Sequence, residues 1–175
     1  MKTQTVLTPA LDRFIARLPK AELHLHLEGS ITPRTFLQLA RRNRVELPAD
    51  DEFGVTRLFH YQHFHEFLGN FMLLSQALVH GEDFADAAYE LGLHLGRQNV
   101  RYAEVMLSAA LHHRRGLDLD EVVQGTAAGF AEARRQGGPR VGLIFDYGRQ
   151  NGPDLAWHLL DAAIRNMRHG VVGWS

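Results

Sequence analysis

The amino-acid sequence predicts the α/β class, as the N-terminal half of a TIM-type (β/α)8 barrel with four parallel strands and intervening helices. Four short apolar segments alternate with longer amphipathic ones, and strands joined through helices pair in parallel by right-handed crossovers. None of the first three strands is followed by the glycine-rich phosphate loop expected of an open nucleotide-binding sheet. A barrel needs about 250 residues, whereas this chain has 175 and stops inside an apolar strand.

The composition is that of one ordinary globular domain, so we treat residues 1–175 as a single partial domain. Hydrophobic residues make up 45% and charged residues 22%, and 19 Lys and Arg against 20 Asp and Glu leave a net charge of -1. This balance gives no electrostatic reason to expect nucleic acid or an anionic membrane as a partner. The absence of cysteine excludes a disulfide scaffold and a thiol nucleophile. Any metal must therefore bind to histidine and carboxylate, and the 11 histidines are the unusual count.

No targeting or membrane signal is evident in the sequence. Residues 1–7 lack the apolar run and the cleavage site of a signal peptide. No segment approaches the run of about 18 apolar residues that a spanning helix needs. We therefore expect a cytoplasmic protein.

In the first half, turn and cap residues delimit the elements. Thr8 and Pro9 are typical of a helix start, apolar residues follow at helical spacing, and Pro19 ends the helix. Thr32 and Pro33 open a second helix in the same way. The expected elements are a helix over 8–18, a strand over 22–27, a helix over 32–43, an irregular loop over 45–56 and an aromatic-rich helix over 62–79.

The second half continues the alternation of strands and helices. Asp118 is expected to cap a helix with Glu121 in the capping-box position, and Gly137 and Gly138 end that helix. The expected elements are a helix from 83, a strand over 100–107, a helix over 118–136, a strand over 141–146, a helix over 153–168 and a strand beginning at 171.

The stretch His24–Gly29 (HLHLEG) carries the strongest chemical signal. On a strand, alternate residues share a face, so His24, His26 and Glu28 are expected on one side and leucines on the other. Polar groups on a strand of a covered parallel sheet are costly unless something pairs with them. Two imidazoles at this spacing can approach one divalent ion at about 2.0–2.1 Å, at the end of the strand where barrel enzymes keep their chemistry. The alternative is an exposed edge strand with its polar side in water.

The segment Leu18–Ser30 (LPKAELHLHLEGS) resembles the opening signature of the adenosine deaminase family of metal-dependent hydrolases. The resemblance continues through 39–43, through 98–105 and at 171–173. It implies a purine substrate, a zinc cofactor and a zinc-bound hydroxide that attacks C6 of the purine and releases ammonia. It also implies that His24 and His26 are zinc ligands and that His26 and Glu28 contact the substrate.

The same resemblance places the other ligands and the proton-transfer residues beyond Ser175, so no catalytic residue is identifiable in this chain and its site is half a site. Adenosine is the first expected substrate. Adenine and aminofutalosine are close rivals, because Glu28 stands where many adenosine deaminases carry Asp. The competing hypothesis is a catalytically inactive fragment that binds metal weakly or serves only as an interaction half. We expect the 175 residues alone to be inactive and prone to self-association through open strand edges.

Other candidates carry weaker signals. His60, His63 and His65 are not expected to bind metal, because i and i+2 do not share a helix face. The aromatic stripe of the 62–79 helix indicates core packing, with an apolar wall for the substrate as the alternative that the family implies. We interpret 112–115 (HHRR) as a solvated basic loop, the alternative being contact with a substrate phosphate. Asp146, Arg149 and Gln150 follow the third strand, where many relatives carry an Arg-His pair, so the role of that loop stays open.

Overall fold

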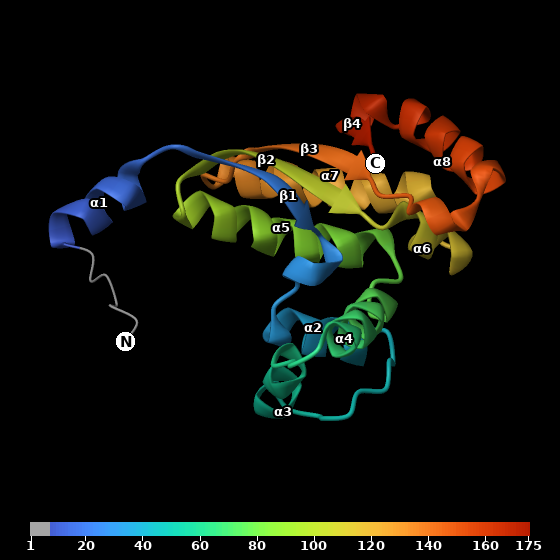
Figure 1. Cartoon of the computed structure of the whole chain (residues 1–175), viewed down its shortest axis with the longest axis horizontal. Helices are drawn as coiled ribbons and strands as arrows, with labels where there is room; N and C mark the ends of the chain where they lie inside the picture. The colour runs from blue at the N-terminus through green and yellow to red at the C-terminus, as the bar shows by residue number, and fades with distance from the viewer. Residues whose placement is uncertain (1–7) are drawn as a thin grey trace.

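The computed structural model describes residues 8–175, and four parallel strands form its sheet in the order β1-β2-β3-β4. The prediction of an α/β fold with four parallel strands is confirmed, because each strand pairs in parallel with the next one along the chain (Figure 1). The segment 1–7, in which no targeting signal was expected, lies outside the described residues. The strands are β1 (Lys20–His26), β2 (Val100–Leu107), β3 (Arg140–Phe145) and β4 (Val171–Trp174).

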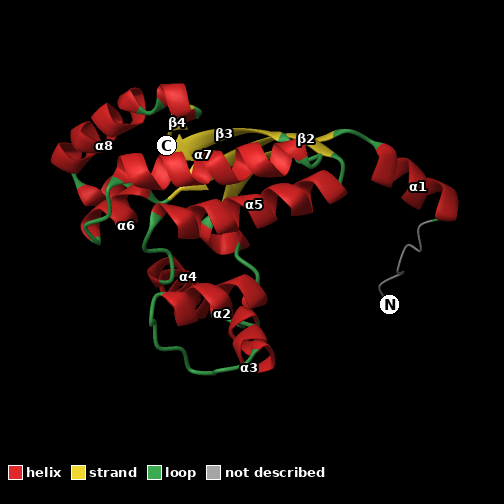
Figure 2. Cartoon of the chain, turned by 180° about the vertical axis from the view of Figure 1, so that it is seen from behind, coloured by secondary structure: helices red, strands yellow, loops and turns green. Residues whose placement is uncertain are grey.

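Two long helices, α5 (Gly81–Arg97) and α7 (Leu119–Arg135), cover one face of the sheet side by side (Figures 1 and 2). Phe84 of α5 and Phe145 of β3 are among the largest fully buried side chains of the core. The helix α8 (Pro153–Arg165) lies near β4 at the far edge of the sheet. The core therefore forms between one sheet face and the connecting helices, as parallel crossovers require.

A smaller helical group lies beyond the carboxyl end of β1 (Figure 1). The chain reaches it through a 3-10 turn, η1 (Glu28–Ser30). It contains α2 (Pro33–Arg42), α3 (Glu52–Thr56) and α4 (Phe64–Gln76).

Two short helices were not predicted. Within the expected loop 45–56, the Asp51 side chain accepts a hydrogen bond from the backbone N–H of Gly54 at 2.6 Å and caps α3. After β2, residues expected to form a basic loop form α6 (Ala109–Arg114). Both helices are too short to show apolar periodicity.

The helix caps agree with the sequence in most respects. Thr8 accepts from the backbone N–H of Leu11 at 3.3 Å and begins α1 (Pro9–Arg17). Asp118 caps α7, but the expected capping box is wrong in one detail. The Glu121 carboxylate instead accepts a hydrogen bond from the backbone N–H of Gly81 at 2.8 Å. This carboxylate therefore joins the starts of α5 and α7.

The first strand departs from simple alternation. Its pairing with β2 shifts register between Glu22 and Leu25, which marks a bulge-like irregularity. Leu23 is 56% exposed, whereas Leu25 packs against the core. The expected leucine face of this strand is therefore only partly covered.

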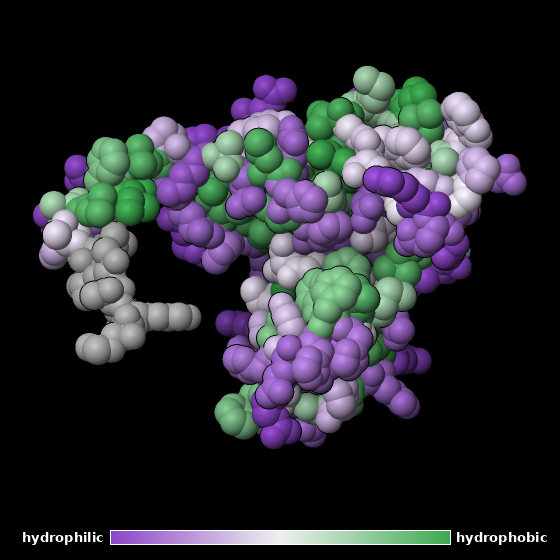
Figure 3. All heavy atoms as spheres, viewed as in Figure 1, coloured by the Kyte–Doolittle hydropathy of each residue, from purple (hydrophilic) through white to green (hydrophobic). Residues whose placement is uncertain are grey.

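Apolar side chains also gather on α1, which extends away from the sheet (Figures 1 and 3). Phe14 of this helix is 59% exposed. No helix in residues 8–175 has the length and apolarity needed to cross a membrane.

The close approach of α5 and α7 depends on glycine. A Cβ at Gly129 would lie 2.1 Å from the carbonyl oxygen of Ala85, whereas a Cβ at Gly69, an exposed position of α4, would meet nothing within 4 Å. We expect Gly129→Ala to lower the free energy of unfolding by about 1–3 kcal/mol, because the helices must separate. Gly69→Ala should raise it by about 0.5–1 kcal/mol through helix propensity. Urea denaturation of both variants checks this, and a Gly129→Ala protein as stable as wild type would contradict it.

Candidate functional site

The predicted site residues lie at the carboxyl ends of the strands, which meet at one edge of the sheet. A cleft of about 430 Å³ opens there, beside α4 and the segments that follow β2 and β3. Barrel enzymes place their reactive groups at this end of the strands. The cleft is lined by side chains that include His26, Phe67, Phe71, Ser108, Asp146 and Tyr147.

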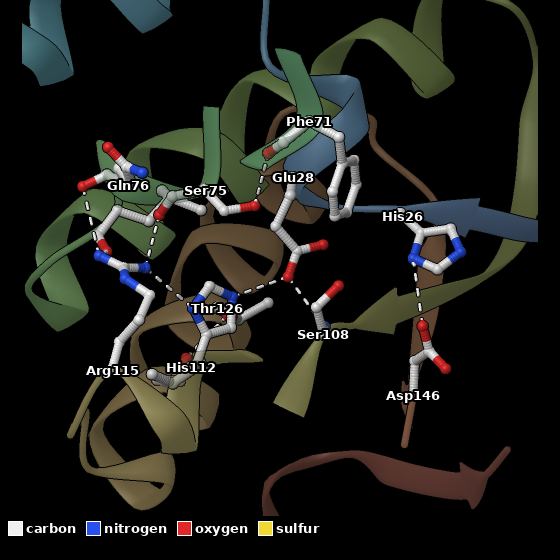
Figure 4. Close-up of polar contacts among 12 residues, drawn as sticks. His26, Glu28, Phe71, Ser75, Gln76, Ser108, His112, Arg115, Thr126 and Asp146 are labelled. Atoms are coloured by element: carbon white, nitrogen blue, oxygen red, sulfur yellow. Dashed lines mark hydrogen bonds and ion pairs between the residues drawn. The ribbon is translucent and has the colours of Figure 1, made fainter. Parts of the chain in front are cut away.

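His24 and His26 lie next to each other at the end of β1. Their ring centroids are 5.8 Å apart in an edge-on arrangement, as expected for alternate residues of one strand. The ring of Phe71 meets His26 edge-on at 5.9 Å. Nδ1 of His26 is buried and has no hydrogen-bond partner, and the nearest carboxylate oxygen, Oδ2 of Asp146, is 3.9 Å away (Figure 4). A buried ring nitrogen without a partner is an unusual and costly feature.

Asp146 follows β3 and faces His26 (Figure 4). Partial burial raises the pKa of Asp146 above its ordinary value. The charge of His26 opposes this shift and that of Glu28 adds to it. The sequence singled out this residue without giving it a role, and the structure places it on the cleft.

Glu28 does not continue the strand. The expected strand over 22–27 ends at His26, and Glu28 begins the turn η1, which directs its side chain into the protein. Glu28 is completely buried. Its Oε1 accepts hydrogen bonds from the backbone N–H of Ser108 and from Nε2 of His112, both at 2.8 Å, whereas Oε2 is buried and has no partner (Figure 4).

These donors set the charge state of Glu28. Burial alone would raise the pKa of Glu28, but the hydrogen bonds from His112 and from the Ser108 N–H outweigh it, and the pKa is lowered. Glu28 is therefore ionised at neutral pH and acts only as a hydrogen-bond acceptor.

The interpretation of 112–115 as a solvated basic loop is wrong for His112. This residue lies in α6, is completely buried, and packs edge-on against Phe84 at 4.9 Å. Arg115 is half-buried and approaches Nδ1 of His112 at 3.3 Å. The i, i+3 spacing of these two residues on a helix was the sequence signal that could have revealed the pair.

Arg115 also binds the end of α4. Its guanidinium donates to the backbone carbonyls of Ser75 at 2.5 Å, Gln76 at 3.2 Å and Leu78 at 2.8 Å. These carbonyls belong to the last turn of the helix and the segment after it, where backbone donors are few, and the Ser75 carbonyl accepts one further hydrogen bond, from the Leu78 N–H at 3.3 Å. Arg115 therefore satisfies the C-terminal end of α4.

The aromatic stripe of α4 indicated core packing, but the structure shows that this helix is only partly packed in the core. Phe64 is 72% exposed and Leu68 is 44% exposed. Phe67, Leu68 and Phe71 line the cleft. The alternative, that this helix forms an apolar wall for the substrate, stays a prediction.

The remaining polar candidates do not form a metal site. His63 precedes α4 as its N-cap, and its ring stacks on that of His65 at 5.6 Å. Gln150 borders the cleft, and Arg149 is exposed in a short 3-10 turn. Across residues 8–175, no three His, Cys, Asp or Glu side chains are grouped so as to hold a metal ion. The described residues therefore fit a zinc ion only as part of a donor set, through the adjacent imidazoles of His24 and His26.

Consecutive parallel strands with an imidazole and a carboxylate at their carboxyl ends are the arrangement expected of a barrel enzyme. Residues 19–175 match the model of the family described as "Adenosine deaminase". The chain belongs to the adenosine deaminase family, which confirms the family that its N-terminal motif resembles.

Relatives and solved structures agree with this assignment. The chain is 35% identical to an adenine deaminase of Zymomonas mobilis over 87% of its own length and 45% of that protein's. A crystal structure of an adenine deaminase from Arthrobacter aurescens matches 89% of this chain and 47% of its own, with 30% identity and a TM-score of 0.80. A zinc-bound amidohydrolase from Burkholderia ambifaria matches 99% of this chain and 48% of its own, with 26% identity and a TM-score of 0.86.

The chain thus spans about half the length of the curated relatives it matches. The prediction of the N-terminal half of a barrel is confirmed by the four consecutive parallel strands and by these structural matches. The assignments of His24, His26 and Glu28 as site residues stay predictions.

The bonds of Arg115 give a prediction for stability. We expect Arg115→Leu to lower the free energy of unfolding by about 2–4 kcal/mol, because it removes three hydrogen bonds to carbonyls at the end of α4. Arg114 is exposed on the same helix, and Arg114→Leu should change stability by no more than about 0.5 kcal/mol. Chemical denaturation measures both variants. Equal effects of the two substitutions would show that Arg115 does not hold α4.

Proposed function

We propose that this chain carries part of the active site of a zinc-dependent deaminase that hydrolyses the exocyclic amine of a purine and releases ammonia. The observation that carries the proposal is the pair of adjacent imidazoles at the carboxyl end of β1, with Nδ1 of His26 buried and unpartnered. Membership of the adenosine deaminase family supports it.

In this proposal His24 and His26 hold the zinc ion, and the rest of the donor set comes from the part of the family's sequence that this chain does not span. The zinc-bound amidohydrolase of similar fold supports the choice of metal. When bound, zinc lowers the pKa of its water and supplies a hydroxide nucleophile at neutral pH.

The side chains of this chain have other tasks at the site. The aromatic rings of Phe67 and Phe71 form an apolar wall for the planar base and exclude water from it. Glu28, as an ionised acceptor, takes a hydrogen bond from the substrate through Oε2. His26, next to both Phe71 and the metal position, also lies near the substrate.

Adenine is the substrate we favour, ahead of adenosine and aminofutalosine. The relatives of Zymomonas mobilis and Arthrobacter aurescens are adenine deaminases. The glutamate at position 28, where many adenosine deaminases carry aspartate, agrees with this choice. The direct test is an assay of ammonia release from the three purines by the protein at its natural length. Failure to deaminate any of them would contradict the proposed function.

The metal assignment gives a prediction for His24 and His26. We expect His24→Ala or His26→Ala to lower zinc content and activity together, because a zinc site with three protein ligands loses most of its affinity for the metal when one ligand is removed. His65→Ala, an exposed position on α4, is the matched control and should leave both unchanged. Elemental analysis of the purified proteins measures the zinc. Stoichiometric zinc in both β1 variants would rule out this strand as the ligand strand.

The assignment of Glu28 to the substrate gives a separate prediction. Glu28→Ala should lower kcat/KM by about 10- to 100-fold, the loss expected for a hydrogen bond to a charged group, while zinc stays bound. Glu28→Asp shortens the side chain by one methylene and should change the preference among the three purines. Loss of zinc from Glu28→Ala would instead place this carboxylate with the metal.

A further inference from the structure

The two oxygens of Glu28 have different surroundings. Oε1 accepts two hydrogen bonds, from the Ser108 N–H and from His112. Oε2 points away from His112 and has no partner, although it is buried (Figure 4). Leaving a buried carboxylate oxygen without a donor costs free energy, and a ligand that supplies a donor recovers it.

The contacts of His112 fix its tautomer. A guanidinium has only N–H donors, so the contact of Arg115 with Nδ1 requires that nitrogen to accept. Nε2 must then carry the proton that His112 donates to Oε1 of Glu28 at 2.8 Å. A neutral imidazole in this tautomer thus connects the arginine to the carboxylate.

Arg115 extends the connection to the wall of the cleft. The same guanidinium that faces His112 donates to the carbonyls at the end of α4. The preceding turns of α4 carry Phe67 and Phe71, which line the cleft. Phe71 also packs beside Gly29, next to Glu28 (Figure 4). Because Oε2 is closed to solvent, a ligand reaches it only when the side chains that cover it move aside.

We propose that His112 and Arg115 are positioning residues for Glu28. His112 holds Oε1 of Glu28 so that Oε2 stays free for a hydrogen-bond donor of the substrate. Arg115 sets the tautomer of His112 and also binds the end of α4. This inference rests on the proposed function, in which Glu28 contacts the purine. Neither residue touches the substrate.

The first test is independent of activity. Nitrogen-15 NMR of histidine-labelled protein, with the His112 signals assigned from a His112→Gln variant, reports which ring nitrogen carries the proton. We expect a neutral ring protonated at Nε2 only. A proton on Nδ1 would overturn the proposal, because Arg115 would then have no acceptor there.

The second test separates positioning from folding by kinetics. His112→Leu removes the donor, and we expect a loss in kcat/KM of about 10- to 100-fold, mainly through KM, with zinc content unchanged. His112→Gln retains an N–H near the position of Nε2 and should recover most of the loss. His113→Leu, on the same helix and directed toward His158, is the matched control and should leave kcat/KM unchanged.

The outcomes are distinct. Equal losses in His112→Leu and His112→Gln, or loss of zinc together with activity, would overturn positioning and indicate a structural role. If His112→Leu does not fold, the kinetics of His112→Gln and the tautomer measured by NMR still test the positioning role of His112. A wild-type protein that deaminates no purine would refute the proposed function, while the NMR result would still support or overturn the hold of His112 on Glu28.

Discussion

The buried carboxylate of Glu28 is the constraint on which the arrangement of the cleft depends. An ionised carboxylate inside a protein is costly unless donors surround it. Here the donors come from the residue after β2 and from α6, far along the chain from β1. The chain must therefore bring the end of β1, the end of β2 and α6 to one place, and the charge of Glu28 penalises any arrangement that separates them.

Parallel pairing makes this meeting possible. When every strand runs in one direction, the segments that follow the strands all emerge at one edge of the sheet. Ser108 follows β2 and Asp146 follows β3, and both line the cleft beside His26. Helices α5 and α7 provide the return paths, and their close contact through small residues keeps the strands adjacent. The polar groups of the cleft are thus a consequence of the topology as much as of local sequence.

The sequence predicted most of the fold because strands and long helices carry their own periodicity. The expected strand over 100–107 coincides with β2, β1 and β3 differ from expectation by one or two residues at their ends, and β4 begins at residue 171 as expected. The helices α3 and α6 have 5 and 6 residues, too few to show a repeat. The pair His24 and His26 followed from alternation, whereas Glu28 lies past the end of the strand. His112 was misread because its neighbours are basic, while the partner that buries it is 84 residues away.

The long-range pairing of Glu28 with His112 also links the two different walls of the cleft. On one side the aromatic rings of α4 offer an apolar surface, and on the other the imidazole of His26 and the carboxyl of Asp146 offer polar atoms. Glu28 and Arg115 lie at opposite ends of one chain of hydrogen bonds through His112, and Arg115 binds α4 directly. A shift of α4 therefore strains the contact between Arg115 and His112, and that strain reaches the donor on which the orientation of Glu28 depends. The position of α4 and the orientation of the Glu28 carboxylate are therefore coupled.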